Sequence, residues 1–200
     1  MNVPIFKIQD NSDFNLFVEF YSPFYKYPGV KKYDENINVN PLEEKNLEKL
    51  YEFKLSPYFS TDKNKKLYEE KILPKLYIIN DLKNRESFNL DEFRSEFKDL
   101  PPVWKTFLLH IINSNEFPIY DQNVHRAYNY IKGKGVKEHS KDNEEREDFY
   151  FDEYYPFIKD LKDQNKVNLR QIDKALFVFG RMLKDKRYLI HLESIHIPSK

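Results

Sequence analysis

Apolar residues recur at helical spacing along most of the chain from residue 40 onward, and no strand-like alternation lasts more than a few residues. The pattern therefore predicts an all-α fold. Helices are expected over residues 14–21, 40–55, 60–82 with a break at Pro74, 89–98, 104–113, 121–132 and 168–184.

Three of these helices carry recognisable start signals. Asn40 is a capping residue followed by a proline, which suits the first helical position. Asn89 followed by Glu92 has the spacing of a capping box, and Asp121 is also a preferred capping residue. The 40–55, 89–98 and 121–132 helices are therefore expected to begin at these residues.

The helix expected over 104–113 is apolar on nearly every side, which is typical of a helix buried by its neighbours. We expect residues 1–39 to be irregular apart from the short helix at 14–21, and 168–184 to be a closing core helix with apolar residues every three or four positions. A length of 200 residues suits one domain or two small lobes that share a core, and we treat 1–200 as a single domain.

Aromatic residues make up 16 % of the chain, so the core is expected to be rich in tyrosine and phenylalanine. Cysteine is absent, which excludes disulfides, a thiol nucleophile and cysteine-held zinc or iron–sulfur clusters. The five histidines show no metal-ligand spacing, so neither a metal nor another cofactor is expected. We see no signal peptide or membrane-spanning run, and expect a cytoplasmic protein with no membrane partner.

Charge is balanced over the chain, with 33 basic and 33 acidic residues, so any contact with nucleic acid requires a local basic surface. Residues 98–137 carry a net charge of +3 and residues 138–163 a net charge of −6. Two interpretations stay open: both segments are solvated faces, or DNA meets the first segment while the second points away.

The most informative stretch is residues 100–131, LPPVWKTFLLHIINSNEFPIYDQNVHRAYNYI. It combines a short Pro-rich turn, a buried helix, an extended step and an aspartate at the start of the next helix. This order of motifs resembles the helix-hairpin-helix DNA glycosylases, such as endonuclease III and the adenine-mismatch glycosylases. Their hairpin has the form L-P-G-V-G-R-K-T-A, and their aspartate follows in contexts such as F-P-I-L-D-G-N-V-x-R.

Residues 100–106, LPPVWKT, match the first motif, and residues 117–126, FPIYDQNVHR, match the second more specifically. The resemblance covers about residues 90–180, including the closing helix IDKALFVFG. Pro102 and Trp104 stand where the family has hairpin glycines. The resemblance implies a two-lobed helical domain whose hairpin N–H groups bind a DNA phosphate.

In such a site the target nucleotide is flipped into a pocket, and a carboxylate supports the positive sugar that forms as the base leaves. The resemblance assigns that role to Asp121. In bifunctional members a hairpin lysine attacks the sugar and forms a Schiff base. An ungapped alignment places Thr106 at that lysine position, whereas a one-residue gap places Lys105 there.

Each candidate has a structural alternative. Asp121 also suits a simple helix cap, Lys105 a solvated lysine and Trp104 a core residue. His125 lies one turn from Asp121 and could face it, or it is a partly exposed surface residue. Arg126 suits either an acidic partner or a phosphate, and Lys132 and Lys134 flank glycines in a loop that could cradle phosphate. The resemblance and these positions together assign DNA contacts to Pro101, Val103, Trp104, Thr106, His125, Arg126, Lys132 and Lys134.

The leading hypothesis is a DNA base-excision glycosylase that acts on double-stranded DNA through Asp121. A non-catalytic helix-hairpin-helix DNA-binding module is the first alternative. A helical protein-interaction domain is the second, favoured by the zero net charge and by the aromatic-rich segment 149–157, FYFDEYYPF.

Overall fold

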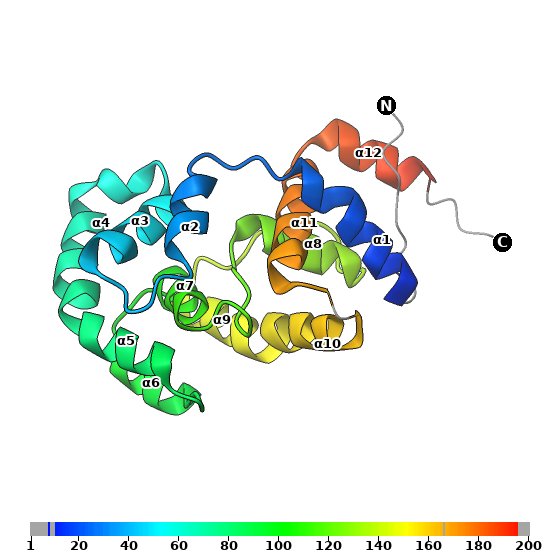
Figure 1. The fold of residues 1–200 in the computed structure, drawn as a ribbon. Coiled ribbons are helices and arrows are strands. Elements are labelled where there is room, and N and C mark those ends of the chain that lie inside the picture. The colour runs from blue at the N-terminus through cyan, green and yellow to red at the C-terminus, as the bar shows by residue number, and fades with distance from the viewer. Residues whose placement is uncertain (1–7, 9–10, 166, 196–200) are drawn as a thin grey trace. The chain divides into compact units, whose positions relative to one another are not determined.

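Every regular element in the described part of the chain is a helix, which confirms the all-α prediction (Figure 1). The computed structural model describes residue 8 and residues 11–165 and 167–195. None of the helices in these ranges is long and apolar enough to cross a membrane. By its internal contacts the chain divides into two compact units: Lys26–Phe117 forms one, and Met1–Tyr25 with Pro118–Lys200 forms the other.

The Lys26–Phe117 unit is built around α7 (Pro102–Ile112), which is buried along almost its whole length, as its composition predicts. Trp104 stacks on Tyr51 at a ring-centroid distance of 4.8 Å, and Phe107 meets Tyr51 edge-on at 5.6 Å. The other helices of this unit are α2 (Val30–Asn36), α3 (Glu44–Leu55), η2 (Tyr58–Ser60), α4 (Asp62–Leu67), η3 (Tyr68–Ile72), η4 (Leu73–Lys75), α5 (Leu76–Asn84) and α6 (Leu90–Glu96).

His110, in the middle of α7, is fully buried and both of its ring nitrogens have partners. Nδ1 lies 2.7 Å from the carbonyl oxygen of Phe117, which can only accept, so Nδ1 carries a proton. Nε2 lies 2.7 Å from the hydroxyl of Tyr33. His110 is therefore a core residue that ties α7 to α2 and to the end of the unit.

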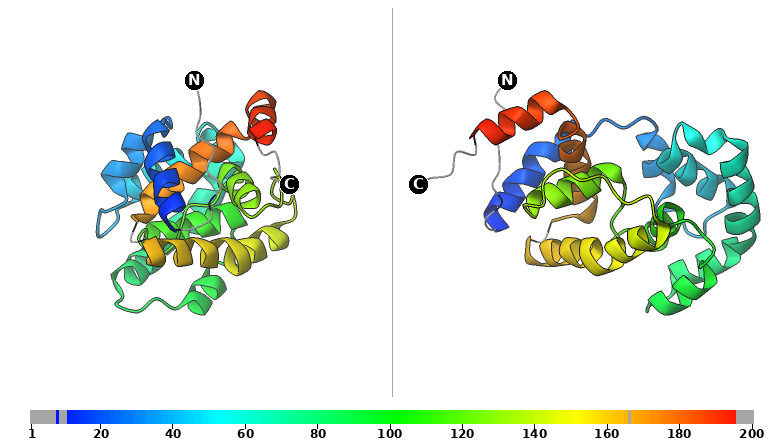
Figure 2. Two further views of the ribbon diagram at one scale, coloured as in Figure 1. Left: turned by 90° about the vertical axis from the view of Figure 1, so that its right-hand side faces the viewer. Right: turned by 180° about the vertical axis from the view of Figure 1, so that it is seen from behind.

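The second unit is organised around α11 (Leu169–Met182), which packs against both α8 (Gln122–Ile131) and α1 (Asn11–Tyr21) (Figures 1 and 2). Phe179 of α11 meets Phe17 and Tyr21 of α1 at 5.4 and 5.2 Å, so this core is aromatic-rich as expected. The remaining helices of the unit are η1 (Ser22–Phe24), α9 (Asn143–Asp148), η5 (Phe149–Tyr154), α10 (Tyr155–Asn165) and α12 (Lys186–Ile195).

Most of the predicted boundaries are confirmed within about two residues. Asn89 caps α6 by accepting from the N–H groups of Asp91 and Glu92. Pro74 lies where the helical path changes from η3 through η4 to α5. Gly133 and Gly135 both have positive φ and lie in the loop after α8.

The predicted start at Asn40 is wrong, because α3 begins at Glu44 with Glu43 as its cap. Asn80 of α5 holds the backbone of Leu42 outside the helix. Its Oδ1 accepts from the Leu42 N–H at 2.7 Å, and its Nδ2 donates to the Leu42 carbonyl at 2.9 Å. The helix therefore starts after Leu42, where Glu43 and Asn46 form a reciprocal capping box.

Candidate aspartate site

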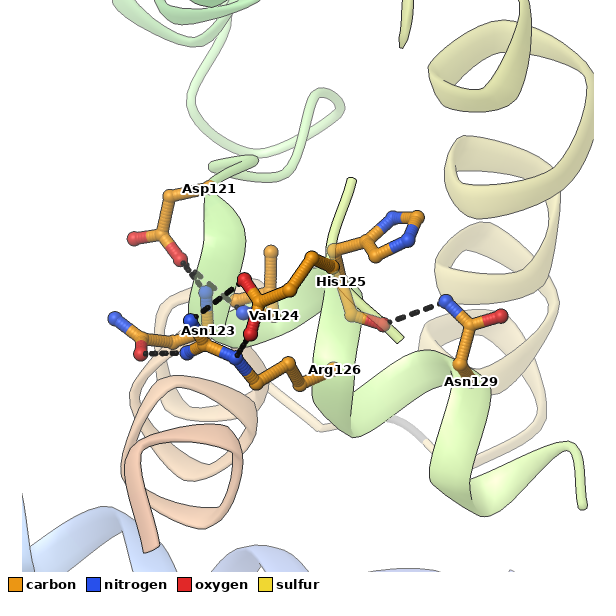
Figure 3. A network of polar contacts seen from close by, with 7 residues as sticks. Asp121, Asn123, Val124, His125, Arg126 and Asn129 are labelled. Atoms are coloured by element: carbon orange, nitrogen blue, oxygen red, sulfur yellow. Dashed lines mark hydrogen bonds and ion pairs between the residues drawn. The ribbon is translucent and has the colours of Figure 1, made fainter. Parts of the chain in front are cut away.

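Asp121 caps α8, as its place in the sequence predicts. Its backbone is extended, and its Oδ1 accepts from the N–H groups of Asn123 and Val124 at 2.7 and 3.1 Å (Figure 3). The side chain is partly exposed, and Oδ2 accepts no hydrogen bond from the residues that the structure describes. One oxygen is thus held by the helix while the other remains available to an approaching group.

Asp121 stands at the N-terminus of α8, the end of a helix that carries a partial positive charge. Its carboxylate acts on two buried tyrosines, Tyr120 and Tyr154. Burial raises the pKa of Tyr120 and of Tyr154 well above the usual range, and the carboxylate of Asp121 raises both further. Both phenols are therefore neutral neighbours at physiological pH.

A close contact between helices fixes where α8 begins. Gly180 of α11 lies against the backbone of Asn123, and a β-carbon on Gly180 would stand 1.8 Å from the Asn123 carbonyl oxygen. No side chain fits in that space, so only glycine allows the two backbones to approach this closely. The contact sets the position of the first turn of α8 and, through it, of Asp121.

A second set of contacts, made by Arg126, holds the same turn. Arg126 is 5 % exposed and forms two hydrogen bonds with the Glu138 carboxylate, at 2.6 and 2.8 Å. Its Nη1 also donates to Oδ1 of Asn123 at 2.8 Å (Figure 3). Of the two partners expected for Arg126, the acidic side chain is therefore the one in this structure, and the guanidinium is buried.

The imidazole of His125 points away from Asp121 (Figure 3), and the side chain is only 7 % exposed. Its Nδ1 lies 2.8 Å from the Tyr120 hydroxyl, and its ring packs 4.5 Å from that of Phe149. Burial, together with the neighbouring His139, lowers the pKa of His125 to about 4. The expectations that His125 lies on the surface or faces Asp121 are both wrong, because its ring is buried against Tyr120 and Phe149.

Lys132 and Lys134 lie beyond the far end of α8, and a ten-residue helix is about 15 Å long, so they are not beside Asp121. Lys134 forms a salt bridge with Glu153 at 2.9 Å. Lys132 lies over the ring of Phe157 at 5.1 Å. The acidic segment therefore packs against the basic one here, contrary to the interpretation in which it points away.

The hairpin candidates belong to the other unit, in the turn between α6 and α7 and in the first turn of α7. Trp104 is 5 % exposed and stacks in the core, so the core alternative describes it in this structure. Lys105 is 4 % exposed and Thr106 is fully buried. The alternative of a solvated Lys105 is therefore wrong, because α7 is buried on the side that carries it.

The hairpin backbone offers few hydrogen-bond donors. Pro101 and Pro102 have no N–H group, and the N–H groups of Leu100, Trp104 and Lys105 donate to carbonyls within the turn. Val103 is the one residue of 100–105 whose N–H has no acceptor among the residues that the structure describes. A phosphate at this turn would meet a single backbone donor.

Sequence reasoning did not identify Gly180, Asn123 and Glu138, which position α8. A glycine inside a strongly periodic helix is a detectable signal, because it weakens the helix unless a close contact requires it. Asn123 and Glu138 carry no such signal.

Comparison of the chain with protein-family models, with curated proteins and with solved structures found no match. The described residues contain no group of three or more potential metal ligands.

Proposed function

We propose that this chain is a DNA base-excision N-glycosylase that acts on a flipped base, with Asp121 as its essential carboxylate. The observation that supports the proposal is the state of that side chain: Oδ1 is held by two backbone N–H groups while Oδ2 is left for a ligand. It stands in the FPIYDQNVHR segment that resembles the glycosylase aspartate motif.

The chemistry requires little more than a fixed negative charge and a water molecule. The bond between C1′ of the sugar and the base nitrogen breaks, and its electron pair leaves with the base. The ionised carboxylate stabilises the positive charge that develops on the sugar. Water then adds to C1′ and loses a proton, which the departed base takes up, and an abasic site remains. A carboxylate locked by a helix N-terminus is arranged before the reaction and need not reorganise during it.

The proposal favours hydrolysis over the Schiff-base route. Lys105 is buried in α7, and Thr106 at the alternative position has no amine. We therefore expect base release without a covalent protein–DNA adduct on borohydride treatment. An adduct that disappears in Lys105→Ala would show that Lys105 becomes accessible in the complex and acts as a nucleophile.

Asp121→Asn is the decisive variant because asparagine caps helices as well as aspartate does. It removes the charge and leaves the cap, so stability should stay within about 0.5 kcal/mol of wild type. Base release from duplexes carrying uracil, oxidised or alkylated bases, or adenine mispairs should fall on the order of a hundredfold or more. Release is measured as strand breaks after treatment with alkali.

Asp142→Asn is the matched control. Asp142 caps α9 with the same pattern of hydrogen bonds, accepting from the N–H groups of Glu144 and Glu145 at 2.8 and 3.0 Å. The control should be as active as wild type. Equal activity of wild type and Asp121→Asn would refute the role of Asp121. If no duplex releases a base, the enzyme proposal fails, and DNA binding without base release would then favour the non-catalytic module.

A further inference from the structure

A protein with zero net charge needs a local basic surface to hold DNA, and the segments considered so far do not supply one. The hairpin offers one free backbone N–H. Arg126 is paired with Glu138, and Lys134 is paired with Glu153. The electrostatic attraction that any DNA-binding function requires must come from another part of the chain.

The turn that joins α11 to α12 has the required charge. Residues 181–187, RMLKDKR, carry four basic side chains and one acidic one, and we name this segment the basic turn. Its charged side chains are all exposed. Arg187 pairs with Asp185 at 3.1 Å, whereas no described residue forms a salt bridge with Arg181, Lys184 or Lys186. Three exposed positive charges thus lie within six residues without a salt bridge to a described residue.

The basic turn borders the candidate site. It begins at the residue after Gly180, whose α-carbon lies against the backbone of Asn123 in the first turn of α8. Lys184 follows two residues after the end of α11, in the turn that leads to α12. The hydrogen bonds from Arg126 lower the pKa of Glu138, and the nearby charge of Lys184 contributes to the same shift. The cations of the basic turn and the cap of Asp121 therefore belong to one region of the same unit.

We propose that the basic turn binds the phosphate backbone of the DNA strand whose base is presented to Asp121, through Arg181, Lys184 and Lys186. This inference rests on the proposed function, and it replaces the hairpin as the main source of backbone contacts. A guanidinium and two ammonium groups on an exposed turn suit phosphate oxygens, and they bind without reading the sequence. The contacts hold the strand, and the chemistry remains with Asp121.

The test compares two triple variants of the full chain. The first is Arg181→Gln, Lys184→Gln and Lys186→Gln. The control is Lys63→Gln, Lys65→Gln and Lys71→Gln, three exposed lysines of the other unit without salt bridges in the described structure, and it removes the same charge. Binding to a fluorescent 20-base-pair duplex is measured by anisotropy from 25 to about 300 mM salt, and circular dichroism checks that each variant folds.

Loss of three phosphate contacts should reduce the slope of log K against log salt by about 2.7 and weaken binding at 0.1 M salt on the order of a hundredfold. The control should keep the wild-type slope. Equal slopes in the two triple variants, or no binding of wild-type protein at 25 mM salt, would overturn the basic-turn proposal. Base release is scored separately: a reduced slope in a protein that releases no base would support the basic turn and refute the glycosylase.

Discussion

The contact between Gly180 and Asn123 makes a sharp prediction, because the space between the two backbones there holds no side chain. Gly180→Ala adds one methyl group whose carbon would stand 1.8 Å from the Asn123 carbonyl oxygen and 2.6 Å from the carbonyl carbon. An ordinary contact begins at 3.4 Å, so α8 and α11 must separate by roughly 1.5 Å to accommodate it.

Two opposing terms set the expected effect on stability. Forcing a methyl group into a packed contact between backbones costs about 3 kcal/mol, the upper end of the usual range for overpacking. Alanine is the better helix former and returns about 1 kcal/mol. The net expectation is a loss of about 2 kcal/mol in the free energy of unfolding, which lowers the urea midpoint by about 1 M.

Circular dichroism during urea titration follows all helices, whereas fluorescence of Trp104, the single tryptophan, reports on the Lys26–Phe117 unit. The backbone amide signals of Asn123 and Val124 should also shift in NMR spectra, because both N–H groups donate to Asp121. The control is Gln171→Ala, an exposed position of the same helix, which should be neutral or slightly stabilising. If Gly180→Ala is as stable as wild type and these amides do not move, the close contact and its role in placing Asp121 are refuted.

Three further predictions test the surroundings of the site. The pKa of His125 is about 4 in the folded protein against 6.5 when unfolded, so unfolding at low pH is coupled to proton uptake by this side chain. The free energy of unfolding should therefore be unaffected by His125 above pH 6.5 and should fall by about 3 kcal/mol between pH 6.5 and pH 4. Urea titrations across this range should show a flatter pH dependence for His125→Gln, and parallel curves would contradict the buried environment. Glu138→Gln removes the charged partner of the buried Arg126 guanidinium and should lower the free energy of unfolding by about 1–3 kcal/mol in urea titrations. The control, Glu144→Gln at an exposed position, should leave the free energy of unfolding almost unchanged. Equal stabilities of the two variants would exclude a structural role for the Arg126–Glu138 pair. Trp104→Ala should destabilise by about 3–5 kcal/mol in thermal unfolding, and a loss below about 1 kcal/mol would show that Trp104 is not a core residue.

Features that depend on interactions between near neighbours in the chain were predicted correctly from the sequence. The all-round apolar pattern of 104–113 predicts a buried helix, and α7 is buried in this way. Asn89 and Asp121 cap the helices that follow them, since a capping hydrogen bond spans only two or three residues. Helix periodicity, prolines and caps therefore predicted the all-α class and placed Asp121 at the start of α8.

Helices with weak local signals were missed, and the expectation that 1–39 is irregular is wrong at α2 (Val30–Asn36). Residues 143–165 form α9, η5 and α10, although their charge and aromatic content show no simple apolar stripe. The face that α9, η5 and α10 bury is set by partners distant in the sequence, such as the backbone of Pro118 and Ile119, which accept from Tyr150 and Tyr154. Tertiary packing supplies the stability that the local sequence lacks.

The contacts that position the first turn of α8 around Asp121 depend on the tertiary structure. Nothing near residue 121 in the sequence indicates that Gly180, 59 residues away, lies against Asn123, or that Glu138 takes up Arg126. The sequence likewise places Asn40 before a proline, yet Asn80 holds Leu42 outside the helix and moves its start to Glu44. Capping and periodicity act between near neighbours and can be read along the chain, whereas the pairing of charges and the spacing of helices depend on which distant residues the fold brings together.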